Sequence, residues 1–146
     1  MTADSAQILV VDDERGMRET LAANLEDQGY RVISCPTGTE GLTRIAEDPP
    51  DIVIADLRLP DVGGLELLEN LKEVNPEAAF ILITGYASVE TAVEALNEGA
   101  FAYITKPFNM EEVYSIVRNA LRQQRLLLEN QRLVETLQTS NADLSS

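Results

Sequence analysis

Short apolar runs alternate with longer segments of helical periodicity along this chain, and the alternation constrains the fold more than any other feature. The runs are rich in β-branched residues and almost continuously apolar, which is typical of strands buried on both faces of a parallel sheet. They occur at Ile8–Val11, Val32–Cys35, Ile52–Ala55, Phe80–Ile83 and Ala102–Ile104. Five strands that alternate with helices predict an α/β protein.

Apolar side chains recur at helical spacing in the segments between the runs, and several of these segments carry start or stop signals. Two segments begin at capping-box spacing, Thr37 with Glu40 and Asn109 with Glu112, and two end near a glycine, Gly29 and Gly99. The apolar stripes comprise Met17, Leu21 and Leu25; Leu42, Ile45 and Ala46; Leu65, Leu67, Leu68 and Leu71; and Val89, Ala92, Val93 and Leu96. The pattern predicts a doubly wound five-stranded parallel sheet with helices on both faces, in the flavodoxin-like strand order 2-1-3-4-5.

The last helix is predicted to run far beyond the domain, because neither Gly nor Pro occurs after Asn109. Its positions Leu126, Asn130, Leu133, Leu137, Ser140 and Leu144 alternate four and three apart, as in a coiled-coil seam with one Asn that sets the register. A single solvated helix with incidental leucines is the alternative. We therefore expect a domain over residues 1–125 and a helical linker over 126–146, which forms a homodimer and leads to an output domain absent from this chain.

Charge and composition limit the partners of the chain. A net charge of −14 disfavours direct binding to nucleic acid or to anionic lipid. No apolar run approaches membrane-spanning length, and the polar segment Met1–Gln7 does not resemble a secretory signal. Cys35 is the only cysteine, and its place at the end of an apolar run favours a buried structural thiol. These features predict a cytoplasmic protein.

Polar residues follow four of the predicted strands at their carboxyl ends: Asp12 and Asp13, then Asp56, Thr84 and Lys106. These ends share one edge of a doubly wound sheet, where ligands bind. Because the first and third strands are neighbours in the expected order, we expect the three carboxylates to converge. Two carboxylates about 4 Å apart repel by roughly 4 kcal/mol at an effective dielectric constant of about 20, so the cluster needs a cation. Oxygen ligands of this kind suit Mg²⁺, with Lys106 as a second positive charge.

A carboxylate beside Mg²⁺ and a lysine is suited to phosphoryl transfer, in which an aspartate carries the phosphate and Thr84 donates to a phosphate oxygen. Each residue also has an ordinary structural role to set against this one. Asp12 and Asp13 are equally suited to cap the first helix. Asp56, Thr84 and Lys106, each taken singly, are ordinary loop, turn and surface residues. Their joint occurrence on one edge favours the chemical interpretation.

Four motifs give this interpretation a family. Residues 6–125 resemble the receiver domains of response regulators in bacterial two-component systems, with the motifs in the expected order and spacing. The motifs are Ile8–Glu14, Asp51–Pro60, Ile81–Gly85 and Tyr103–Phe108.

The resemblance implies a signalling domain rather than an enzyme with turnover, although such a domain assists its own phosphorylation and dephosphorylation. Asp56 would accept phosphate from a phosphohistidine of a sensor histidine kinase. Asp13, Asp56 and the backbone carbonyl of Arg58 would bind Mg²⁺ directly, Asp12 would bind it through water, and Lys106 would pair with the phosphoryl group. Thr84 and Tyr103 would form a switch pair that alters the face of the fourth helix, fifth strand and fifth helix. The Lys106–Pro107 peptide bond would be cis.

One departure and three alternatives accompany this assignment. Gly63 stands where the family often has a polar residue, which puts in doubt only the cap of the third helix. A phosphatase of the haloacid dehalogenase class would need its nucleophile in a D-x-D pattern after the first strand, whereas Asp12-Asp13-Glu14 stands there. A flavin or dinucleotide carrier would need a glycine-rich loop at that point. A receiver-like dimerisation domain that never carries phosphate remains the third alternative.

Overall fold

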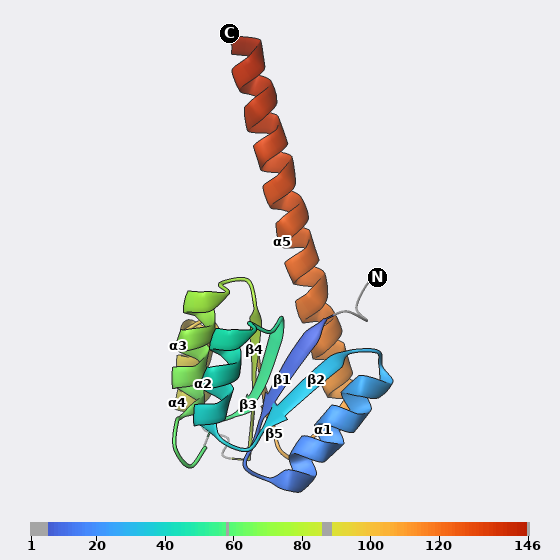
Figure 1. The fold of residues 1–146 in the computed structure, drawn as a ribbon, viewed down its shortest axis with the longest axis vertical. Coiled ribbons are helices and arrows are strands. Elements are labelled where there is room, and N and C mark those ends of the chain that lie inside the picture. The colour runs from blue at the N-terminus through green and yellow to red at the C-terminus, as the bar shows by residue number, and fades with distance from the viewer. Residues whose placement is uncertain (1–5, 58, 86–88, 146) are drawn as a thin grey trace.

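A computed structural model describes residues 6–57, 59–85 and 89–145, and within them five strands alternate with five helices (Figure 1). Each strand lies within one residue of its predicted bounds. The strands are β1 Gln7–Val11, β2 Arg31–Cys35, β3 Ile52–Asp56, β4 Ala79–Thr84 and β5 Ala102–Thr105. The helices are α1 Arg15–Asp27, α2 Gly38–Glu47, α3 Gly64–Val74, α4 Val89–Asn97 and α5 Met110–Ser145.

The five strands form one sheet in the order β2-β1-β3-β4-β5, and every neighbouring pair is parallel. This confirms the predicted doubly wound fold. From β1 the chain adds β2 on one side and then β3, β4 and β5 on the other, so the strand order reverses between β1 and β3. These two strands pair from Ile8 with Ile52 to Val11 with Ala55. All carboxyl ends therefore meet at one edge, with β1 and β3 side by side at the switch point where such folds bind ligands.

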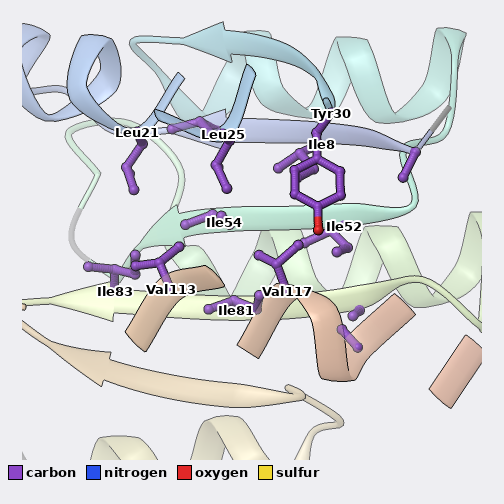
Figure 2. Packing of buried hydrophobic residues seen from close by; sticks show 14 of the residues in the cluster. Ile8, Leu21, Leu25, Tyr30, Ile52, Ile54, Ile81, Ile83, Val113 and Val117 are labelled. Carbon is purple, nitrogen blue, oxygen red and sulfur yellow. The ribbon is translucent and has the colours of Figure 1, made fainter. Parts of the chain in front are cut away.

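Alternate side chains of the central strands enter two separate apolar cores, because successive residues of a strand point to opposite faces. Figure 2 shows the core on one face, where Ile8, Ile52, Ile54 and Ile81 meet α1 and α5. The intervening residues of the same strands pack against α2, α3 and α4 in the second core. Figure 1 shows the same division, with α1 and α5 on one side of the sheet and α2, α3 and α4 on the other. Both cores together hold the central strands fully buried.

Burial departs from the expectation at the sheet edges and on α4. The edge strands β2 and β5 are only partly buried, since each has a neighbour on one side alone. On α4, Val93 and Leu96 of the predicted stripe are half exposed, whereas among the described side chains of this helix the small residue Ala95 is buried against the second core. The side chains of Val89 and Ala92 lie outside those described. α4 therefore keeps large apolar side chains on its outer surface.

The predicted helix signals are confirmed. The Thr37 hydroxyl accepts the Glu40 N–H at 3.2 Å, and the Asn109 side-chain oxygen accepts the Glu112 N–H at 2.9 Å. Gly29 and Gly99 take φ values of 97° and 110°, a backbone conformation that glycine adopts without strain and that closes α1 and α4. α3 begins at Gly63 without a side-chain cap, as the departure there implied.

α5 is a single helix of 36 residues that extends well past the sheet (Figure 1). Its first turns pack on the sheet through Val113, Val117 and Ala120. Beyond the body, Leu126 and Leu133 are 53% and 60% exposed. In the part of the chain that the structure describes, no helix is both long and apolar enough to cross a membrane.

Candidate functional site

The residues predicted to share the sheet edge do so. Asp56 is the last residue of β3 and Thr84 the last of β4, while Asp12 follows β1 and Lys106 follows β5. The register of β4 with β5 pairs Thr84 with Thr105, and the Thr84 carbonyl then accepts the Lys106 N–H at 2.8 Å. Parallel pairing of adjacent strands thus places all four positions along one row.

Three carboxylates meet at this edge. Asp12, Asp13 and Asp56 each offer one oxygen, and these oxygens lie within 4.8 Å of one another. Asp12 and Asp56 are buried, with 3% and 8% of their surface exposed, whereas Asp13 is exposed. The cluster is therefore open to solvent on one side. Hard oxygen donors on a half-open rim fit Mg²⁺, which keeps several waters when it binds to proteins.

Among the described residues, Lys106 is the one that pairs with the cluster through a positive charge. Its Nζ donates to Asp56 Oδ2 at 2.8 Å and to Asp12 Oδ2 at 3.2 Å, and it lies 4.0 Å from Glu14 Oε1. Its side chain is only 19% exposed, so solvent screens these contacts less than at an open surface. Glu14 was not among the predicted site residues, because nothing in a single sequence distinguishes it from other exposed acids.

Burial and charge act on the site in opposite directions. Burial raises the pKa of Asp12, and Asp56 adds to this rise, while the Glu14 N–H and Lys106 lower it without cancelling it. Burial opposes the charge of Lys106, but its contacts with Asp56 and Asp12 outweigh burial and raise the pKa of the ammonium. One lysine stays charged and still does not neutralise the carboxylates. The electrostatics therefore favour a further cation.

Asp12 serves the local turn and the cluster at once. Its Oδ1 accepts the Glu14 N–H at 2.9 Å, while its Oδ2 faces Lys106. Arg18 donates to the Asp12 carbonyl at 2.8 Å, which holds the same residue from α1. The residue that caps α1 is Glu14, and it makes no side-chain cap bond. Asp12 therefore does not cap α1, and its side chain instead stabilises the turn that leads into this helix.

The remaining predicted residues lie around this centre. Thr84 is fully buried at the end of β4, and Tyr103 on β5 is half-buried and packs against the second core. The Lys106–Pro107 peptide bond is cis, as the resemblance implied. Arg58, whose backbone carbonyl was expected to bind Mg²⁺, lies outside the described residues.

Comparison with known proteins assigns a family to this arrangement. A family model described as the response regulator receiver domain matches residues 8–118. The regulatory protein AtoC of Escherichia coli strain K12 is 39% identical over 134 residues, which cover 92% of this chain and 29% of AtoC. The chain therefore spans less than a third of the length of that curated relative.

Solved structures agree with the sequence comparison. A CheY-like response regulator receiver domain protein from Methanospirillum hungatei JF-1 is 38% identical with a TM-score of 0.79, over 82% of this chain and 96% of that one. The solution structure of the beryllofluoride-activated NtrC4 receiver domain dimer is 34% identical with a TM-score of 0.77, over 81% of this chain and 98% of that one. Whole receiver domains are thus matched along nearly their full length.

Proposed function

The chain belongs to the response regulator receiver domain family of two-component systems, whose members are phosphorylated on an aspartate, and from this membership we propose that Asp56 is the acceptor. One observation carries the proposal. The Asp56 carboxylate ends β3 at the switch point, 2.8 Å from Lys106 Nζ, with oxygens of Asp12 and Asp13 within 4.8 Å. Asp56 is the one carboxylate of the cluster that belongs to a strand, since Asp12 and Asp13 lie in the loop after β1.

The chemistry is transfer of a phosphoryl group to a carboxylate. An Asp56 oxygen attacks the phosphorus of a phosphohistidine on the sensor kinase, the P–N bond breaks, and the imidazole leaves with the bonding electron pair. Asp13 and Asp56, with Asp12 through water, would hold Mg²⁺, which neutralises charge on the phosphoryl oxygens. Lys106 orients and stabilises the same oxygens, and the Thr84 hydroxyl donates to one of them.

The signal would leave the site through Thr84 and Tyr103. Thr84 ends the strand next to Asp56, and Tyr103 lies on the neighbouring strand at the register position of Leu82. We propose that the hydroxyl moves toward the phosphoryl group and that the ring of Tyr103 turns inward. The face of α4, β5 and α5 would then change its preference among partners. The exposed side chains of Val93 and Leu96 on α4 give that face an apolar surface suited to binding.

The long α5 would link the domain to its output. We propose that residues 1–125 form the receiver and that 126–146 form a linker which pairs with a second copy, partly under control of phosphorylation. The exposed Leu126 and Leu133 support pairing, and the NtrC4 structure is a dimer of that protein. Relatives such as AtoC are regulatory proteins more than three times as long, so any contact with DNA would belong to a domain beyond this one. A kinase donor implies a cytoplasmic location.

Intact mass after incubation with Mg²⁺ and acetyl phosphate tests the acceptor. We expect the parent protein to gain one phosphate, because the small donor bypasses the kinase, and we expect Asp56→Ala to gain none. A gain by both proteins would show that another aspartate is the acceptor. A parent that gains nothing would favour a receiver-like dimerisation domain without phosphate chemistry.

A further inference from the structure

A carboxylate outside the acidic cluster joins the loop after β3 to the start of α2. Asp61 lies in the segment between β3 and α3. Its Oδ1 accepts the N–H of Gly38 at 2.9 Å and that of Val62 at 2.8 Å. Its Oδ2 accepts the N–H of Thr39 at 2.9 Å and also the Thr39 hydroxyl. Both oxygens are therefore occupied by the start of α2 and by the loop itself.

These contacts complete the first turn of α2. The first N–H groups of a helix have no partner within it and together carry a partial positive charge. Thr37 accepts one of them, from Glu40, and Asp61 accepts those of Gly38 and Thr39. The Thr39 hydroxyl and these N–H groups hold the pKa of Asp61 well below its usual range. The carboxylate therefore stays ionised, and its bonds persist, at neutral pH.

Shape reinforces the same contact. A Cβ added to Gly38 would lie 2.6 Å from the Val62 Cβ and 2.7 Å from the Val62 carbonyl oxygen. Only glycine lets α2 and the loop approach this closely. The other end of the loop is also closely packed, though less so, since Gly64 donates to the Leu57 carbonyl at 3.1 Å and a Cβ there would lie 3.0 Å from the Asp56 carbonyl oxygen. The described residues of the β3–α3 loop are thus held at two points, by Gly64 on Leu57 and by Asp61 on the start of α2.

We propose that Asp61 is a positioning residue for the acceptor site, which fixes the backbone after Asp56 by holding the β3–α3 loop on the start of α2. The inference rests on the proposed function. Asp61 stands three residues after Arg58, whose carbonyl the family resemblance makes a ligand of Mg²⁺. A loop released from α2 would bind the ion less well, because the entropy of ordering the loop would then oppose binding.

Mg²⁺ binding, measured by titration calorimetry without any phosphodonor, separates positioning from mere capping. Asp61→Ala removes the carboxylate, and Gly38→Ala forces the two segments apart from the opposite side. Both are expected to weaken Mg²⁺ binding by about tenfold, the usual effect of losing a residue that orients metal ligands. Gly63→Ala is the matched control in the same loop, because no atom lies within 4 Å of its added Cβ. It should bind Mg²⁺ as the parent does.

Four further measurements decide between positioning and capping. Circular dichroism establishes that each variant is folded. If Asp61→Ala is poorly folded, Asp61→Asn takes its place, and because it keeps one acceptor oxygen, it should bind Mg²⁺ more weakly than the parent does but still measurably. If both disruptive variants lose thermal stability but bind Mg²⁺ as the parent does, Asp61 only caps α2 and the inference is wrong. If the positioning role is correct, saturating Mg²⁺ should largely restore phosphorylation of Asp61→Ala and Gly38→Ala. A parent that takes no phosphate would refute the acceptor function, whereas unaltered Mg²⁺ binding in the variants would refute the positioning role alone.

Discussion

Asp13 is the exposed member of the acidic cluster. Repulsion among the three carboxylates is expected to lower the stability of the protein when no ion is bound. The Asp13 oxygen lies within 4.8 Å of those of Asp12 and Asp56. We expect Asp13→Asn to raise the free energy of unfolding without Mg²⁺ by about 1 kcal/mol, because one carboxylate repulsion is removed. Addition of Mg²⁺ should then stabilise the variant much less than the parent. Urea unfolding with and without the ion measures both effects.

The control for Asp13→Asn is Glu69→Gln, which likewise removes one negative charge, but from the exposed surface of α3. It should leave the stabilisation by Mg²⁺ unchanged. A variant Asp13→Asn that is less stable than the parent in the absence of Mg²⁺ would show that the cluster is not repulsive.

Single residues could be predicted where a rule places them. The shared edge could be predicted because parallel strands align their carboxyl ends, so a position directly after an apolar run was sufficient for Asp12, Asp13, Asp56, Thr84 and Lys106. Other residues follow no such rule. Asp61 pairs with Gly38 and Thr39, which stand 23 and 22 residues earlier, and the pairing depends on how the β3–α3 loop meets the start of α2 in space. A Pro-Asp turn predicts only a turn, so its partner could not be deduced.

Among the elements, α5 is hydrogen-bonded to the amino edge of the sheet through the side chain of Gln124. Gln124 Nε2 donates to the Asp51 carbonyl at 2.7 Å and to the Glu77 carbonyl at 3.0 Å, just before β3 and β4. We expect Gln124→Ala to lower the free energy of unfolding by about 1–2 kcal/mol, the usual effect of losing hydrogen bonds at a partly buried site. Gln123→Ala, an exposed neighbour with the same change in chemistry, should have little effect in the same urea titration. Equal losses in the two variants would contradict the anchoring role.

Elements were predicted better than their orientation. Strand bounds followed from short apolar runs, and helix ends from capping residues and glycines, because both signals are local. On α4 the apolar spacing suggested a stripe against the sheet, yet among its described side chains Ala95 is buried while Val93 and Leu96 are half exposed. A short helix can turn a small residue toward its neighbour and so pack closely. Which choice prevails depends on the partner surface, and periodicity alone does not contain that information.

At the scale of the whole molecule, the sheet order could be predicted from the alternation of strands and helices. Association with a second copy could not be predicted in the same way, because it depends on opposing contributions from charge and from exposed leucines. A net charge of −14 per chain opposes pairing, while the half-exposed leucines of α5 favour it. Salt should shift the balance, since the screening length falls from about 10 Å at 0.1 M to about 3 Å at 1 M.

We therefore expect sedimentation equilibrium to show a dimer that strengthens as salt is raised, and strengthens further with Mg²⁺ and beryllofluoride as a phosphate mimic. Leu126→Gln with Leu133→Gln should keep the chain monomeric at every salt concentration, because both substitutions fall on the predicted seam. Leu127→Gln with Leu128→Gln is the matched control, since these leucines are also exposed but point to other sides of the helix. Equal effects of the two pairs would show that the seam does not mediate association. Salt that weakens the dimer would show that ion pairs, rather than leucines, hold the two chains together.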